Sequence, residues 1–116
     1  MMRVHDTASG RRHILCTYPG WAASWGLLSD GALAWAGNSL YGSPPSTSRI
    51  LLPTSILKRL AMQVASVDDL LTEISSNDLC FTDGAFTFGD RSGAVAVLEC
   101  MAGHNEWRKI TTGWAV

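Results

Sequence analysis

The sequence predicts an α+β fold, because its expected strands and helices are grouped along the chain rather than alternating. Three strand-like segments come first, two amphipathic helices follow, and two further strands form a hairpin. The length of 116 residues suits one domain over residues 1–116. This order favours antiparallel strands with the two helices on one side over a doubly wound parallel sheet.

The first two expected strands each end at a turn signal. Residues 11–18 alternate in polarity before the break "YPG". Residues 21–28 follow and end at "SDG", a turn typical of hairpins. The two segments are therefore expected to be neighbours in an antiparallel sheet.

The third expected strand covers residues 32–37 and runs directly into Asn38. Leu33 and Trp35 share one face of this strand, which has the character of a core face. The opposite face ends at Asn38 and carries only small side chains before it, namely Ala32, Ala34 and Ala36. That face leaves room for another layer or a ligand to approach closely.

Two helices are expected after the proline-rich loop at residues 41–48. Residues 54–64 have helical spacing, with a stripe formed by Ile56, Leu57, Leu60 and Ala61. The second helix should begin at Ser66, whose hydroxyl can cap it while Asp69 reaches back. Its apolar face consists of Val67, Leu70, Leu71 and Ile74.

The segment after the helices is expected to be a β-hairpin. Residues 85–89 and 94–99 are short apolar runs on either side of "GDRSG". From residue 102 onward the sequence is polar and mixed, and it contains at most the start of a strand.

Composition and charge exclude several classes of protein. The formal net charge is −1 and no basic stripe exists, which argues against a nucleic-acid partner. No run approaches the ~20 apolar residues that a membrane span needs, and the first twelve residues contain no signal-peptide core. Three cysteines without C-x-x-C spacing disfavour a disulfide framework and a zinc site. We expect a reduced, cytoplasmic protein with no metal or cofactor.

Cys16 is the first nucleophile to consider, with His13 three residues before it. The two side chains should point to opposite faces of one strand, so they cannot form a thiolate–imidazole pair. We interpret Cys16 as a small buried apolar residue. The same structural interpretation applies to Cys80 and Cys100, and the polar surroundings of the two remaining histidines indicate solvated surface, at His5 and His104.

The acidic residues beside glycine are interpreted as turn formers. Asp83 precedes Gly84, and Asp90 opens the turn that ends at Gly93. Glu99 lies late in an apolar strand, where a half-buried carboxylate needs a partner, and Arg59 of the first helix is the expected one. The scattered tryptophans are assigned to core packing rather than to base stacking, at positions 21, 25, 35, 107 and 114.

Several segments between Arg12 and Cys100 form a recognisable series, namely Thr17 to Gly20, Gly26 to Gly31, Asn38 to Leu40, Arg59, Ser66 to Ile74, and Gly93 to Glu99. Their order and spacing resemble those of the acyl-CoA:6-aminopenicillanate acyltransferase family. These are N-terminal-nucleophile (Ntn) hydrolases related to the choloylglycine and penicillin V acylases. Leu28 stands where an asparagine is common in that family.

The resemblance implies a four-layer αββα sandwich and a cysteine nucleophile freed by self-cleavage at a Gly-Cys bond. The free α-amine of that cysteine, titrating near ~8, would act as its base. The resemblance also implies that Asn38 donates its side-chain NH₂ to the oxyanion. The alternative is that Gly37 and Asn38 merely turn the chain.

The nucleophile of such an enzyme is not found in this sequence, since the three cysteines follow Leu15, Leu79 and Glu99. We therefore expect a partial Ntn domain that lacks the nucleophile segment. It would be a fragment or split part of an acyltransferase or amidohydrolase for linear amides or acyl-CoA, inactive alone. A second chain or a self-copy would complete the sandwich. The alternatives are a non-catalytic binding or assembly module, and a thiol enzyme that uses Cys16.

Overall fold

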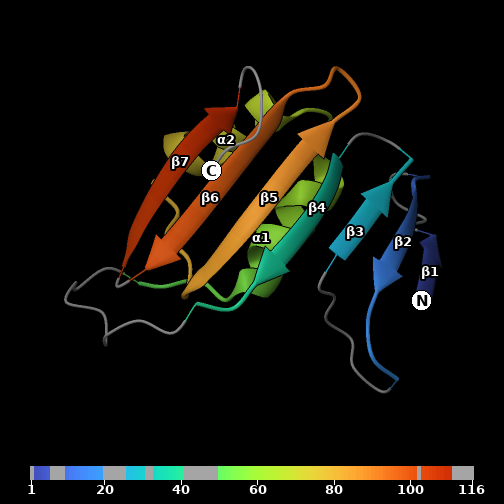
Figure 1. The fold of residues 1–116 in the computed structure, drawn as a ribbon, viewed down its shortest axis with the longest axis horizontal. Helices are drawn as coiled ribbons and strands as arrows, with labels where there is room; N and C mark the ends of the chain where they lie inside the picture. Colours follow the sequence, from blue (N-terminus) through green and yellow to red (C-terminus); the bar gives the residue numbers. More distant parts are fainter. Residues whose placement is uncertain are drawn as a thin grey trace.

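The computed structural model describes residues 2–5, 10–19, 26–30, 33–40, 50–101 and 103–110. These residues form an antiparallel sheet and two helices, so the predicted α+β class is confirmed (Figure 1). The seven described strands are β1 (Met2–His5), β2 (Arg12–Cys16), β3 (Gly26–Ser29), β4 (Leu33–Asn38), β5 (Gly84–Asp90), β6 (Val95–Met101) and β7 (His104–Ile110). The helices, α1 (Thr54–Gln63) and α2 (Val67–Ser76), lie between β4 and β5 in the chain.

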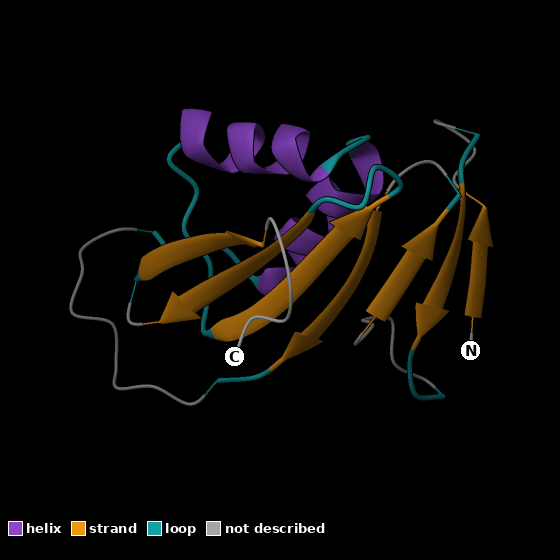
Figure 2. Cartoon of the chain, turned by 45° about the horizontal axis from the view of Figure 1, so that its top comes forward, coloured by secondary structure: helices purple, strands orange, loops and turns teal. Residues whose placement is uncertain are grey.

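The strands lie side by side in the order of the sequence, β1 to β7, and each neighbouring pair is antiparallel. β4 and β5 are direct neighbours even though both helices separate them in the chain. The chain therefore leaves the end of β4, forms both helices, and returns as β5 directly beside β4. Both helices lie on one side of the sheet, as Figure 2 shows, and they cover the half that contains β4 to β7 (Figure 1).

Four hydrogen bonds join the helical segment to residues that lie next to the strands. The backbone N–H of Leu52 donates to Cys80 at 2.8 Å, and the N–H of Thr82 donates to Leu52 at 2.9 Å. The guanidinium of Arg11 donates to the carbonyls of Met62 and Val64 at the end of α1, at 3.2 and 3.1 Å. The two bonds from Arg11 satisfy carbonyls that a helix end leaves without partners.

The core lies between the helices and the facing side of β4, β5 and β6. The predicted core face of β4 is confirmed, since Leu33 and Trp35 are buried. Trp35, Phe86 and Phe88 form an aromatic cluster with ring centroids 6.1 to 6.5 Å apart. The helices contribute five buried side chains to this core, Leu57, Ala61, Val67, Leu70 and Ile74.

The helix predictions agree closely with the structure. α1 ends one residue before its expected limit, and α2 begins after the predicted cap residue Ser66. The Ser66 hydroxyl accepts a hydrogen bond from the backbone N–H of Asp69 at 3.1 Å. This bond satisfies one of the free N–H groups of the first helical turn.

The strand predictions need corrections at both ends of the sheet. The sequence analysis did not predict β1, and it predicted at most the start of a strand where β7 lies. β7 is an edge strand, and its charged residues resemble those of a loop. β3 covers only the last part of the expected strand 21–28, and residues 20–25 lie outside the described part of the chain. Core packing of the tryptophans is observed for Trp35 and in part for Trp107, while the other three lie outside the described residues.

Candidate functional site: the open sheet face and Asn38

The helices cover one face of the sheet, and we call the opposite face the open face. The strand register arranges its side chains in three rows that cross the sheet. The apolar row is Ile14, Leu28, Ala34, Gly89, Val95 and Ile110. The middle row is Cys16, Gly26, Ala36, Thr87, Val97 and Arg108, and the polar row is Asn38, Ala85, Glu99 and Glu106.

The open face is apolar over most of its area and accessible to solvent. Leu28 is 56% exposed and Ile14 is 36% exposed, and Ala36 and Thr87 are also exposed. Polarity increases along the strands, from the apolar row to the polar row. The face therefore combines a surface suited to packing with polar groups at one end.

Asn38 is the last residue of β4 and lies at the polar end of the open face. It pairs with Ala85 of β5, and its side chain is exposed. Ala34 and Ala36 precede it on the same face, because side chains alternate along a strand. Among the described residues, none is hydrogen-bonded to the Asn38 side chain. Its NH₂ group is therefore able to donate to another molecule.

Gly37 is explained by packing against the aromatic cluster. A Cβ atom at Gly37 would lie 2.7 Å from Cδ1 of Phe86 and 3.0 Å from Cζ3 of Trp35. A Cβ atom at Gly84 would lie 2.6 Å from Cζ of the same Phe86 ring. The two glycines thus make room for this ring in the sheet. Gly37 has no positive φ angle, so a tight turn is not the reason for it.

Glu99 has a charged partner, but the expected partner was wrong. Its carboxylate accepts a hydrogen bond from the guanidinium of Arg108 on β7 at 3.0 Å, and not from Arg59, which is exposed on α1. The helices lie on the other side of the sheet, so α1 does not reach the open face. Arg108 also reduces the repulsion between Glu99 and Glu106, which face each other across β6 and β7.

Cys16 is exposed in the middle row, so the interpretation of Cys16 as a buried apolar residue was wrong. His13 and Leu15 take the inner face of β2 and are buried, which leaves Ile14 and Cys16 outside. The opposite directions of Cys16 and His13 are as predicted. The two ring nitrogens of His13 have no hydrogen-bond partner among the described residues, and Ser29 faces His13 across the strand pair.

Cys80 and Cys100 are buried, as predicted for structural residues. The Cys80 thiol donates to the carbonyl of Gly103 at 2.9 Å, and the amide of Asn105 donates to the carbonyl of Leu79 at 2.6 Å. Burial, followed by the nearby Cys80 and Asp83, raises the pKa of the Cys100 thiol to about 12. A thiol with this pKa is protonated at neutral pH and is a poor nucleophile.

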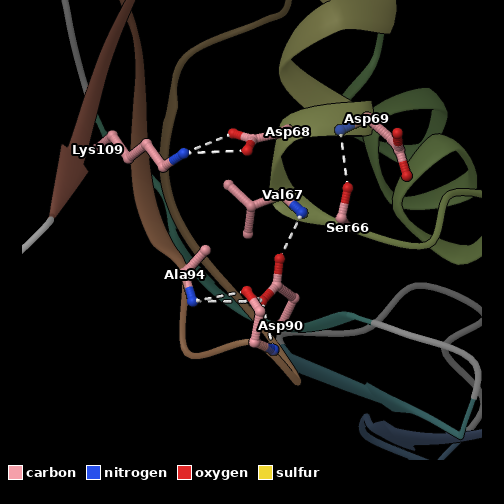
Figure 3. Close-up of polar contacts among 8 residues, drawn as sticks. Ser66, Val67, Asp68, Asp69, Asp90, Ala94 and Lys109 are labelled. Atoms are coloured by element: carbon pink, nitrogen blue, oxygen red, sulfur yellow. Dashed lines mark hydrogen bonds and ion pairs between the residues drawn. The ribbon is translucent and has the colours of Figure 1, made fainter.

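Asp90 forms the turn predicted for it and also joins this turn to α2 (Figure 3). Its carboxylate accepts bonds from the hydroxyl of Ser92 at 2.6 Å, from Ala94 N–H at 3.2 Å and from Val67 N–H at 3.0 Å. The Ser92 hydroxyl, followed by Val67 N–H, holds the pKa of Asp90 below its usual 3.8. These bonds give the carboxylate a structural role.

The described residues contain no cluster of three or more side chains that could hold a metal ion. His104 is exposed at the start of β7, and the side chain of His5 lies outside the described part. Sequence reasoning did not identify Arg108 or the three rows, because both depend on which residues face each other across strands.

Within the described ranges, neither helix has the length and apolar character needed to cross a membrane. The sequence matches no protein-family model, no curated protein and no solved structure.

Proposed function

We propose that this chain forms one half of a cysteine Ntn acyltransferase or amidohydrolase and is inactive without the other half. In the complete enzyme a second sheet covers the open face, and Asn38 donates a hydrogen bond to the oxyanion. The observation that carries this proposal is the position of Asn38, exposed at the polar end of an apolar sheet face that the helices leave uncovered.

The open face has the properties of an inner face of a sandwich. Two sheets pack about 10 Å apart and bury the side chains of their facing sides. The residues of β4 and β5 on this face are small, which permits such an approach. Leu28 and the valines of β6 add apolar area, whose removal from water contributes about 25 cal/mol per Å².

The site chemistry supports a donor role for Asn38 and a nucleophile that comes from the other half. Cys80 and Cys100 are buried, and Cys16 lies on β2, two strands from β4. Neighbouring strands are about 4.8 Å apart, so Cys16 lies roughly 10 Å from β4. Nucleophile and base would be the thiol and amine of one N-terminal cysteine. The substrate class is a linear amide or an acyl-CoA, and no cofactor is required.

The alternative is a non-catalytic assembly module that uses the open face only to bind another protein. The apolar row favours it, because six residues in register carry no group that could take part in catalysis. Both functions place a partner on the same face. They differ in the role of Asn38, which matters for rate only in the enzyme. Free cysteines suit a cytoplasmic setting in either case.

Co-expression tests the enzymatic function. The chain would be produced together with the product of a neighbouring reading frame that contains a Gly-Cys bond, and hydrolysis of penicillin V and acyl transfer from acyl-CoA would be measured. We expect self-cleavage at the Gly-Cys bond and turnover. Asn38→Ala should lower kcat by about 10²–10³, since an oxyanion donor acts mainly in the transition state.

The matched control is Asn77→Ala, which removes the same side chain at the end of α2, away from the open face. It should leave kcat unchanged. Full activity of the Asn38→Ala complex would contradict the donor role. A stable complex without turnover would favour the assembly module.

A further inference from the structure

We infer that the second sheet is supplied by a second copy of this chain, packed open face against open face. The two-fold axis would run parallel to the strands, between β4 and β5. This inference rests on the assembly-module alternative of the proposed function, because a second copy has no Gly-Cys bond and could not supply the nucleophile of the enzyme. It follows from the sizes of the open-face side chains, from their area and from their charge.

The apolar row is nearly symmetric about the line between β4 and β5. Read across the sheet, its residues are large, large, small, small, medium and large: Ile14, Leu28, Ala34, Gly89, Val95 and Ile110. A two-fold axis on that line places β4 on β5 of the second copy, β3 on β6, and β2 on β7. Each residue of the row then meets a residue of similar size, and the same patch serves both copies, as in an isologous interface.

The distribution of sizes also fits two twisted sheets. Twisted sheets that pack face to face come closest at the centre and diverge toward their corners. The central strands carry small residues at the axis, Ala34 and Ala36 on β4 and Ala85, Thr87 and Gly89 on β5. The larger side chains, Ile14, Leu28 and Ile110, lie on the outer strands, where they would fill the wider space.

The area of the open face is sufficient for a stable dimer. Strands β2 to β7 span five spacings of about 4.8 Å, or about 24 Å, and the long strands measure about 20 Å. The flat outline is roughly 500 Å² per copy, which makes about 1,000 Å² in total before side-chain relief is added. A specific interface should exceed about 1,000 Å².

Charged side chains of the open face lie near its margins, and most of them are paired. Arg12 and Asp30 form an ion pair at 2.8 Å beyond the apolar row, and Glu99 is paired with Arg108 near the opposite end. An apolar centre with a polar rim is the usual arrangement of a protein interface. The net charge of −1 gives little repulsion between two copies.

The dimer would bring together the polar rows of the two copies. Asn38 of each copy would face Ala85 of the other, on strands adjacent to the axis. Two side-chain amides would then lie on either side of the axis at the same end of the sandwich.

A paired charge experiment tests this arrangement. Sedimentation equilibrium of the wild-type chain should show a dimer. Leu28→Lys and Val95→Glu, which face each other across the proposed interface, should each shift the chain to monomer. An equimolar mixture of the two variants should dimerise again, because the introduced lysine meets the introduced glutamate. Ile56→Lys is the matched control on α1, where Ile56 is 39% exposed away from the open face, and it should remain dimeric.

Urea unfolding of each variant shows whether it folds, and only folded variants count. A monomeric wild-type chain at high protein concentration overturns the inference, as does a dimer that survives both substitutions. Failure of the two mixed variants to dimerise overturns the proposed axis and therefore the inference.

Maleimide labelling of Thr87→Cys in a Cys16→Ser background separates this inference from the proposed function. In the dimer the introduced thiol should be protected, and Leu28→Lys should expose it. A monomer with a reactive thiol overturns the self-copy and leaves the face free for another partner. A monomer with a thiol as unreactive as Cys80 means that the chain covers its own face, which overturns the proposed function as well.

Discussion

At the scale of single residues, Gly37 and Asn38 are adjacent but serve different needs. Gly37 faces the inner side of the sheet, where the Phe86 ring occupies the place of a side chain. Asn38 faces the open side, where no described residue is hydrogen-bonded to its side chain. One residue is required by packing, and the other is available for binding.

Gly37→Ala should destabilise the fold by about 1–3 kcal/mol, because a methyl group would lie too close to Phe86 and Trp35. Gly89→Ala is the matched control, since its Cβ would come no closer than 3.8 Å to another atom. It should change the free energy of unfolding by less than about 1 kcal/mol. Urea unfolding in the monomeric Leu28→Lys background compares them, and equal losses would contradict the packing argument.

Asn38→Ala should change the free energy of unfolding by less than about 1 kcal/mol, since its amide makes no hydrogen bond with the described residues. Asn105→Ala should cost roughly 1–3 kcal/mol, because the carbonyl of Leu79 would lose its donor. Thermal or urea unfolding of the two variants measures the difference. A loss of several kcal/mol for Asn38→Ala would return this residue to a structural role.

At the scale of elements, Asp90 holds the β5–β6 turn against the start of α2 (Figure 3). Lys109 of β7 forms a second link to this helix, through an ion pair with Asp68 at 2.7 Å. Both side chains of this second pair are largely exposed, so the pair contributes at most about 1 kcal/mol. The carboxylate of Asp90 is therefore the main polar attachment of α2.

Asp90→Asn should lower the free energy of unfolding at pH 7 by about 1–2 kcal/mol. The folded state holds the pKa of Asp90 below 3.8, so its contribution is present above that pH and is lost as the pH falls through the folded pKa. The difference between wild type and variant should therefore narrow in acid. Arg12 also lowers the pKa of Asp30. Because Asp30 is present in both wild type and variant, it does not affect the difference in unfolding free energy between them.

Urea midpoints of the two proteins at about pH 7 and about pH 3 test this expectation. Ser92→Ala removes the first cause of the shift and should reproduce part of the effect. A difference that stays constant between the two pH values would show that the charge of Asp90 is not what stabilises the turn.

At the scale of the whole molecule, the arrangement is a two-layer structure with one layer of helices and one exposed sheet face. The chain alone should show no hydrolysis of penicillin V, no acyl transfer and no self-cleavage. Its buried thiols are not nucleophilic, and Cys16 has no imidazole on its own face of β2. Product analysis by mass spectrometry measures this. Turnover that is lost in Cys16→Ser would identify Cys16 as a catalytic nucleophile.

Local patterns in the sequence were sufficient for the helices and for most of the central strands. The cap at Ser66, the apolar stripes and the alternation around Trp35 depend on residues close together in the chain, so their physical cause can be read from the sequence. The face of the strand on which Asn38 lies follows from the same alternation.

Contacts between distant residues decided the rest. Alternation shows that Ile14 and Cys16 share one face of β2 and that His13 and Leu15 share the other. It does not show which of these faces points to the core, because that depends on which side of the sheet the helices cover. The pairing of Glu99 with Arg108 depends on the register of β6 against β7, an edge strand too polar to be recognised from its sequence. The close approach of Phe86 to Gly37 arises only once β4 and β5 are paired, because these two residues lie far apart in the sequence.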